Sequence, residues 1–302
     1  MAEYYFGLAG WSYPDWEGVV YPSGASRGFD QLGYVAQFFD VIELNNTFYR
    51  IPESKTVENW VRRVRHNPRF RFTAKVFQGF THDAKSLDET ELKQFLQAME
   101  PLQKGDRLGG LLLQFPASFQ NTPANRERLS ELADRFGQYP LVVEFRHRSW
   151  DLPTVLEWLS TQKIGFCNVD EPRFRHLMRP SAHVTSPIGY VRFHGRNYQN
   201  WYSKEATRDS RYDYLYSDLE LDEWVPRIEE MGKESKQLYV IGNNHFRGQA
   251  PANILQLKSK VTEGPVSVPE PMLKSYPNLQ KIAGRRKEDK GQRSLFDTEE
   301  EP

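Results

Sequence analysis

Short apolar runs of strand type alternate along the chain with stretches of helical period. The strand-type runs are Tyr4–Leu8, Val41–Asn45, Arg71–Val76, Gly110–Gln114, Leu141–Phe145, Ile164–Val169, Gly189–His194 and Gln237–Ile241. Between them, apolar side chains recur at the i, i+3, i+4, i+7 spacing of amphipathic helices. The helical stretches are Phe29–Phe39, Glu89–Met99, Asn125–Phe136, Leu152–Leu159, Leu219–Met231 and Ala252–Val261. Strands that alternate with crossover helices predict a parallel sheet.

The number of these units favours one α/β architecture. Eight strand–helix units in roughly 260 residues are typical of a closed (β/α)8 TIM barrel. An open doubly wound sheet is the structural alternative, but it usually has fewer strands and often a Gly-rich phosphate loop. The sequence contains neither G-x-G-x-x-G nor G-x-x-x-x-G-K-[ST]. We therefore predict a TIM barrel.

The pattern changes after the last unit. We place the barrel domain at residues 1–262. From 263 the segment GPVSVPEPMLKSYPNL is aperiodic and Pro-rich, and GRRKEDKGQRSLFDTEEEP is charged and poor in apolar residues. Residues 263–302 are therefore predicted to be a Pro-rich linker followed by a disordered tail.

Composition narrows the class of protein. The 302 residues include 40 Lys+Arg and 40 Asp+Glu, so no overall positive field attracts nucleic acid or an anionic membrane. The run WVRRVRHNPRFRF is a local basic concentration, which we interpret as a solvated helix face. A single cysteine, Cys167, excludes an intramolecular disulfide and a multi-cysteine zinc site. The N-terminus lacks a signal-peptide pattern and no apolar run is long enough to cross a bilayer, so we expect a cytoplasmic protein with no membrane partner.

Polar side chains collect at the carboxyl ends of the predicted strands. In a TIM barrel these ends converge on one rim, which carries the active site. We predict catalytic roles for Glu43, Lys75, Glu144, Asp170 and His194. We predict substrate binding by Trp11, Tyr13, Asn45, Tyr49, Arg50, Gln114, Arg146, His147, Arg192, Arg196, Asn243 and Asn244. Each of these taken alone is explained equally well as a loop residue. Their convergence on one rim is what points to a site.

The residue types at this rim suit an anionic substrate. Arginines bind phosphate or carboxylate groups bidentately, and carboxylates and histidines supply acid–base catalysis. A divalent metal fits the same residue types, but no H-E-x-x-H or other ligand spacing requires one, so the cofactor is left open. The absence of a G-x-S-x-G elbow argues against hydrolase chemistry of that type, and Cys167, inside a strand, is interpreted as structural.

Seven blocks of the sequence resemble one known family. The blocks GWSYPDWEGVVYP, VIELNNTFYRIP, FTAKV, LLLQFPASF, VVEFRHRSW, YVRFHGR and NNHFRGQAPAN are similar, in order, to those of the YecE-like family, domain of unknown function 72. The resemblance extends from Gly7 to about Lys260 and implies a TIM barrel. It implies no reaction, because no activity is established for the family. Some relatives have Asp where this chain has His245, so the resemblance gives no support for an essential carboxylate there.

A short motif lies in the predicted tail. Gln292, Leu295 and Phe296 fit the Q-x-x-L-F form of peptides that dock on the bacterial DNA sliding clamp. A disordered tail can present the Gln amide to a polar subsite and the apolar pair to a pocket. The alternatives are a chance match of five residues and a tail that packs on its own barrel.

Three functions remain open from the sequence. The first is a phosphodiesterase or nuclease-like enzyme that acts on a phosphorylated or nucleic-acid substrate and is linked to DNA repair through the clamp motif. The second is a sugar or sugar-phosphate isomerase, epimerase or glycosidase, in which aromatic rings stack on the sugar and carboxylates move protons. The third is a non-catalytic barrel that binds a ligand.

Overall fold

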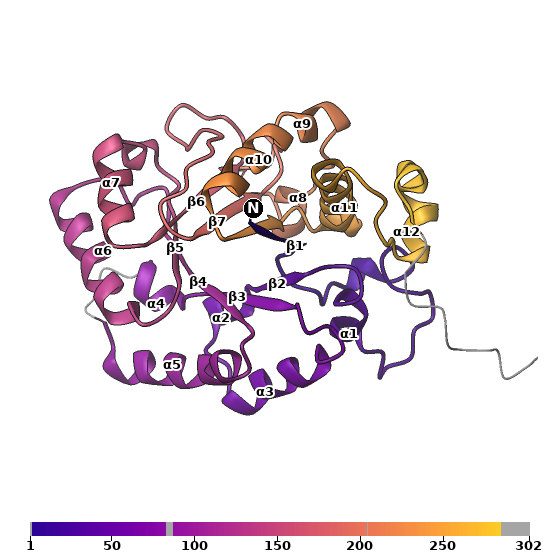
Figure 1. Ribbon diagram of the computed structural model, residues 1–302, viewed down its shortest axis with the longest axis horizontal. Helices are drawn as coiled ribbons and strands as arrows, with labels where there is room; N and C mark the ends of the chain where they lie inside the picture. Colours follow the sequence, from indigo (N-terminus) through magenta and orange to yellow (C-terminus); the bar gives the residue numbers. More distant parts are fainter. Residues whose placement is uncertain (1, 83–86, 204, 285–302) are drawn as a thin grey trace, which may run out of the picture.

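A computed structural model describes residues 2–82, 87–203 and 205–284. Within these residues, eight parallel strands form a closed barrel in sequence order, which confirms the predicted TIM-barrel architecture (Figure 1). The strands are β1 (Glu3–Leu8), β2 (Val41–Leu44), β3 (Arg71–Lys75), β4 (Leu108–Gln114), β5 (Leu141–Glu144), β6 (Gly165–Asp170), β7 (Ile188–Phe193) and β8 (Gln237–Gly242). The barrel closes where β1 pairs with β8 from Glu3↔Gln237 to Leu8↔Gly242.

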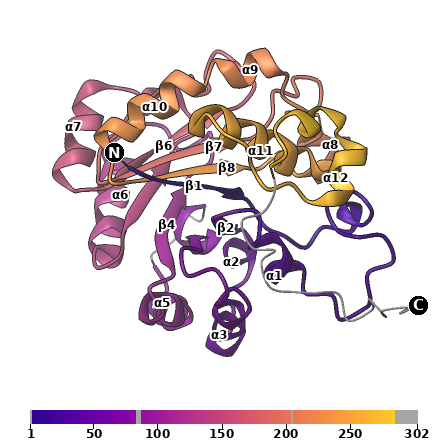
Figure 2. The same ribbon diagram turned by 45° about the vertical axis from the view of Figure 1, so that its right-hand side comes forward.

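Helices cover the outside of the barrel or lie in the loops at the ends of the strands (Figures 1 and 2). They are α1 (Gln31–Val35), α2 (Asn46–Tyr49), α3 (Ser54–Arg63), α4 (Gln78–Thr81), α5 (Glu89–Lys104), α6 (Pro123–Phe136), α7 (Pro153–Thr161), α8 (Arg208–Arg211), α9 (Asp218–Asp222), α10 (Val225–Glu234), α11 (Gln249–Thr262) and α12 (Glu270–Ser275). Short 3-10 turns are η1 (Pro14–Trp16), η2 (Arg148–Trp150), η3 (Phe246–Gly248) and η4 (Pro277–Lys281).

The outer layer departs from the predicted pattern in three places. The helix predicted over Leu219–Met231 is divided into α9 and α10, with Trp224 between them and Pro226 in the first turn of α10. Residues 171–187 connect β6 to β7 without a helix. Helix α3 was not among the helices predicted from apolar periodicity, because only Val57 and Trp60 are buried within its polar sequence. Its last residues, 60–63, belong to the basic run that was interpreted as a solvated helix face.

The barrel interior changes from aromatic to ionic along its axis. Near the amino ends of the strands, the rings of Tyr5 and Tyr239 stack at 5.0 Å, and Tyr190 lies 5.8 Å from Tyr239. Toward the carboxyl ends, charged side chains replace the branched apolar residues that usually fill such a barrel. Alternate strand residues share a face, so this change brings side chains from β2, β3, β5 and β7 to one end of the interior.

The segment after α11 packs against the barrel. Helix α12 lies beside α11 in both views (Figures 1 and 2), Val266 forms a bridge with Ala283, and Met272 and Leu279 are buried. These apolar anchors show that the Pro-rich segment up to Gly284 does not behave as a free linker. The predicted disordered tail and the motif Gln292, Leu295 and Phe296 lie outside the described residues. Among the helices that are described, none combines the length and the apolar character needed to cross a bilayer.

Candidate functional site

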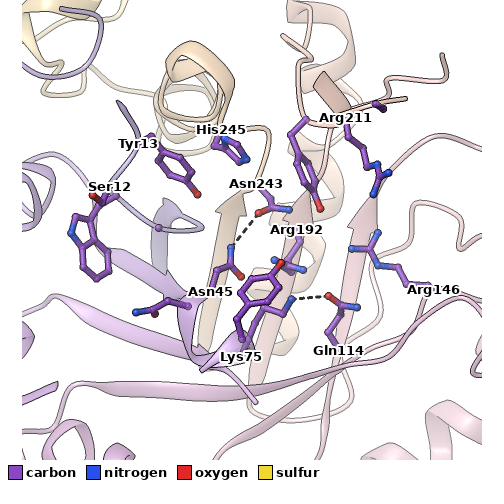
Figure 3. Close-up of a pocket in the computed structure, with 16 residues that line it drawn as sticks. Ser12, Tyr13, Asn45, Lys75, Gln114, Arg146, Arg192, Arg211, Asn243 and His245 are labelled. Atoms are coloured by element: carbon purple, nitrogen blue, oxygen red, sulfur yellow. Dashed lines mark hydrogen bonds between the residues drawn. The ribbon is translucent and has the colours of Figure 1, made fainter. Parts of the chain in front are cut away.

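A cavity of about 610 Å³ opens at the carboxyl ends of the barrel strands (Figure 3). Its volume lies within the range of small-molecule sites. It is lined by Gly10, Trp11, Ser12, Tyr13, Asn45, Asn46, Tyr49, Lys75, Gln114, Arg146, Arg192, Ala206, Arg211, Tyr212, Asn243 and His245. Four of these described residues are lysine or arginine, a fifth is His245, and none is acidic.

Arg192 on the floor of the cavity ties two carboxylates together. Its Nη2 donates to Glu43 Oε1 at 2.5 Å, and its Nη1 donates to Glu144 Oε2 at 2.5 Å. The Tyr190 hydroxyl donates to the other Glu43 oxygen at 2.8 Å. All four side chains are buried. Buried ions need this degree of pairing, so the floor is a rigid and largely neutralised platform.

Arg146 connects this platform to a further acid. Its Nε lies 2.6 Å from Glu144 Oε1, and its Nη1 donates to Glu171 Oε2. The pKa values of Glu144 and Glu171 are shifted in opposite directions. Burial alone would raise the pKa of Glu144, but Arg146 and Arg192 hold that pKa well below its ordinary range. For Glu171 burial outweighs the attraction of Arg146, and the pKa is raised to about 7.

His194 fills the space between Arg146 and β8. Its Nε2 lies 3.1 Å from Arg146 Nη2, and its Nδ1 lies 2.9 Å from Asn243 Nδ2. Complete burial, reinforced by the positive charge of Arg146, lowers the pKa of His194 to about 3. His194 is therefore neutral at physiological pH and orients Arg146 and Asn243 rather than serving as a cation.

Lys75 reaches the cavity from the end of β3 with a different set of neighbours. Its Nζ donates to the amide oxygen of Gln114 at 2.8 Å and lies 3.9 Å from the centre of the Phe48 ring. No carboxylate of the described residues is within salt-bridge distance of it. Burial, with a smaller contribution from the positive charge of Arg192, lowers the pKa of Lys75 to about 7.

Two guanidinium groups meet at one side of the cavity. Figure 3 shows Arg211, from α8, and Arg146, from the end of β5, pointing toward each other. Arg211 Nε is buried without a hydrogen-bond acceptor, and no acidic side chain of the described residues pairs with Arg211. Arg146 is already paired with Glu144 and Glu171, so the positive charge of Arg211 is the one that an anion in the cavity would balance.

The structure brings most of the predicted residues to this cavity. Those that line it are Trp11, Tyr13, Asn45, Tyr49, Lys75, Gln114, Arg146, Arg192 and Asn243. Glu43, Glu144 and His194 are completely buried and contact the lining arginines from below.

Asp170 and Arg196 do not belong to this group. Asp170 accepts hydrogen bonds from Arg196 Nε at 2.9 Å, from the Tyr216 hydroxyl at 2.7 Å and from Trp224 Nε1 at 2.6 Å. Tyr216 and Trp224 belong to the outer layer, so Asp170 faces the helices. Its neighbour on the same face, Asn168, contacts Met231 of α10 at 3.2 Å. The expected convergence of Asp170 with the other four catalytic candidates is therefore not found.

Three further candidates lie away from the cavity wall. Asn244 donates to Tyr214 O at 2.8 Å and to Asn253 Oδ1 at 3.0 Å, so it joins loop and helix. His147 caps the turn η2, because its Nδ1 accepts a hydrogen bond from the Ser149 backbone N–H at 3.2 Å. Arg50 is exposed. None of the three lines the cavity.

The sequence analysis missed Glu171, Arg211 and Tyr212. Glu171 directly follows β6 and continues the alternation of Cys167, whose Sγ lies 3.8 Å from Glu144 Oε2. Alternation extended one residue past the strand could therefore have found it. Arg211 and Tyr212 lie in the long connection between β7 and β8, and no local sequence signal places them at the rim. His245, which was not selected, stacks on Tyr13 at 4.4 Å in the cavity wall.

The lining residues do not form a metal-binding set. Among the described residues, no group of three or more His, Cys, Asp or Glu side chains is arranged to hold a metal ion. Glu43 and Glu144 use their oxygens on Arg192, Arg146 and Tyr190. The lining includes the cationic nitrogens of one lysine and three arginines and the side-chain amides of Asn45, Gln114 and Asn243, and such donors attract anions.

The comparisons with known proteins agree with this architecture. The profile of the family described as "Protein of unknown function DUF72" matches residues 5–276. The chain belongs to the DUF72 family. This confirms the resemblance inferred from the seven sequence blocks, and the matched range includes α12 as well as the barrel.

Individual DUF72 relatives match most of the chain. UPF0759 protein YunF of Bacillus subtilis (strain 168) is 30% identical over 267 residues, which are 84% of this chain and 93% of that protein. A crystal structure of a DUF72 family protein from Thermotoga maritima MSB8 is 36% identical with a TM-score of 0.78, covering 86% of this chain and 99% of that one. A DUF72 family protein from Enterococcus faecalis V583 is 27% identical with a TM-score of 0.75, covering 87% and 96%. The family description names no activity.

Proposed function

We propose that this DUF72 protein is an enzyme that binds a small phosphorylated substrate in the cavity and promotes proton removal from a carbon next to a carbonyl group. This is the chemistry of a sugar-phosphate isomerase or epimerase. The observation that carries the proposal is the cavity wall, which presents Lys75, Arg146, Arg192 and Arg211 and no acidic side chain among the described residues.

The anion-binding part of the proposal rests on Arg146 and Arg211. The two guanidinium groups point toward each other, and Arg211 retains an unused buried donor. A phosphate between them accepts several charge-assisted hydrogen bonds and balances the positive charge of Arg211. Arg211 is the more available of the two, because Arg146 already contacts Glu144, Glu171 and His194. Arg192 is likewise engaged, since both of its terminal nitrogens bind carboxylates.

The proton-transfer part rests on Lys75. With its pKa lowered to about 7, a substantial share of its side chain is an uncharged amine at neutral pH. A group that titrates near the working pH is the most effective in acid–base catalysis. By contrast, the buried acids Glu43 and Glu144 are held by arginines, and His194 remains neutral.

The phosphodiesterase or nuclease reaction predicted from the sequence shares the phosphate-binding wall but has less support. Hydrolysis needs a group that activates water, and the carboxylates nearest the cavity are committed to ion pairs. The cavity also suits a small molecule better than a nucleic-acid duplex, since a duplex needs a broad basic surface. Docking on the sliding clamp through Gln292–Phe296 stays a separate prediction.

Deuterium incorporation tests this proposal. The protein in D2O is incubated with dihydroxyacetone phosphate, D-ribulose 5-phosphate and D-fructose 6-phosphate, and proton NMR follows exchange at carbons next to the carbonyl. We expect exchange with at least one compound and a loss of 100-fold or more in Lys75→Met. That variant, purified identically, also controls for contaminating isomerases.

Two results would contradict the proposal. One is exchange at the same rate in the wild type and in Lys75→Met, and the other is no exchange with any of the three compounds. Hydrolysis of bis(4-nitrophenyl) phosphate that depends on Arg146 and Arg211 would favour the phosphodiesterase prediction instead.

A further inference from the structure

Three described lysines form ion pairs with acidic side chains, whereas Lys75 contacts a neutral amide. Lys104 pairs with Glu100 at 2.7 Å, Lys258 with Asp40 at 2.9 Å and Lys260 with Asp218 at 2.9 Å. Lys75 is more buried than these, with 7% of its surface exposed, and its polar contact is the neutral amide of Gln114. A buried ammonium without a carboxylate partner is costly, so the site favours the uncharged amine.

The surroundings of the amine suit a nucleophile. The Phe48 ring covers one side of Nζ at 3.9 Å, and Gln114 Oε1 holds it at 2.8 Å. Lys75 is also a cavity-lining residue, together with Arg146 and Arg192. A lysine that is desolvated and placed beside other cations is the arrangement in which an amine attacks a carbonyl group.

We propose that Lys75 forms a Schiff base with the carbonyl group of a phosphorylated ketose or aldose bound in the cavity. This inference rests on the proposed function and specifies how Lys75 acts, as a covalent catalyst rather than as a general base. It also names the substrate class, a carbonyl compound whose phosphate is held by Arg146 and Arg211.

The covalent step balances as follows. The lone pair of Nζ forms a bond to the carbonyl carbon, the C=O π electrons move to oxygen, and one amine proton is transferred to that oxygen. The resulting hydroxyl leaves with a proton from solvent as water while nitrogen forms the C=N bond. The sum is amine, carbonyl and one proton giving an iminium ion and water.

The neighbouring arginines also explain why the iminium makes a proton on the adjacent carbon more acidic. Arg192 and Arg146 oppose a positive charge on nitrogen, so the iminium draws electrons strongly from the neighbouring carbon. A proton on that carbon becomes more acidic. Solvent water accepts this proton, because the Lys75 nitrogen has no free electron pair in the iminium and no acidic side chain among the described residues lines the cavity.

Reductive trapping tests this inference on the full-length protein. The protein is incubated with dihydroxyacetone phosphate, reduced with sodium borohydride, digested and mapped by mass spectrometry. We expect one adduct of the reduced triose phosphate at Lys75, at least tenfold above the labelling of any other lysine. Dihydroxyacetone without phosphate should label Lys75 at least tenfold less.

Two controls separate covalent catalysis from adventitious labelling. Labelling of Lys75 should rise through about pH 7, whereas exposed lysines react only at a much higher pH. Gln114→Glu places a carboxylate beside Nζ and should move the labelling midpoint of Lys75 upward by at least one pH unit. Unmodified Lys75, or labelling spread evenly over exposed lysines, would overturn the inference. If deuterium exchange still depends on Lys75 when trapping fails, the proposed function stands and only the covalent step is lost.

Discussion

At the scale of single residues, the site is governed by how each buried charge is paired. Arg192 binds two carboxylates and stays charged, whereas Lys75 is buried against an amide and an aromatic ring. The same barrel interior therefore contains a permanent cation and an amine that titrates near neutral pH. Arg192 gives the site its shape, and Lys75 supplies its reactive group.

The pKa of Lys75 leads to a prediction about stability. Between pH 7 and 10.5 the unfolded chain holds a proton on Lys75 that the folded chain has lost, so the stability contributed by this residue rises with pH. Each pKa unit corresponds to about 1.4 kcal/mol, so the cost at pH 7 exceeds the roughly 1 kcal/mol of the Gln114 hydrogen bond. Lys75→Met should therefore be more stable than the wild type at pH 7, and the difference should shrink toward pH 10.5.

Urea unfolding of the two proteins at several pH values checks this. Lys75→Arg, which keeps a charge that does not titrate in this range, serves as the control and should be less stable than Lys75→Met throughout. A difference between the wild type and Lys75→Met that does not change with pH would contradict the lowered pKa.

The alternation of side chains along a strand explains which of these residues were placed correctly from the sequence. Glu43, Lys75, Glu144 and Arg192 were correctly expected to converge, because each lies at the carboxyl end of a strand. Asp170 was misplaced because both faces of a barrel strand are buried. The strand GFCNVD is buried along its whole length and has Asn168 and Asp170 on one face. A polar face at the end of a barrel strand was expected to point into the barrel, but here it packs against the helices.

At the scale of elements, Asp170 connects the end of β6 to the outer layer. It accepts hydrogen bonds from Arg196, Tyr216 and Trp224, and Arg196 extends the network to Glu223 at 3.0 Å. Gly195 permits this arrangement, since its φ of +88° turns the chain so that His194 points inward while Arg196 reaches Asp170. The β7–β8 connection that carries Arg211 begins at this anchor.

We predict that Asp170 stabilises the fold and takes no part in the reaction. Asp170→Ala leaves the buried guanidinium of Arg196 without its main partner and should lower the free energy of unfolding by about 3–5 kcal/mol. Chemical denaturation measures this change. Glu100→Ala, which removes an exposed ion pair with Lys104 within helix α5, is the matched control and should have little effect. A stable Asp170→Ala protein that has lost deuterium exchange would instead return Asp170 to the catalytic group.

The hydrophobic pattern predicted the strands well and the connections between them less well. All eight strands lie within one or two residues of their predicted ranges, and their order in the barrel follows the sequence. The β7–β8 connection is long and carries only short helices, so local periodicity gave no position for Arg211 or Tyr212. Their place in the cavity results from tertiary packing.

At the scale of the whole molecule, an almost neutral chain concentrates positive charge in one place. The 40 basic and 40 acidic residues balance overall, but the cavity wall is cationic among the residues described. This local excess, rather than a field over the whole surface, is what we expect of a protein that selects a small anion. The central claim is therefore that the cavity binds phosphate between Arg146 and Arg211.

Titration calorimetry with inorganic phosphate tests this claim most directly. The wild type, Arg211→Ala and the control Arg62→Ala, whose side chain lies on α3 and bonds Asn59, are compared at one pH and ionic strength. We predict one saturable site in the wild type, unchanged affinity in Arg62→Ala and at least tenfold weaker binding in Arg211→Ala. Equal phosphate affinity in all three proteins, or no binding by the wild type, would contradict the account.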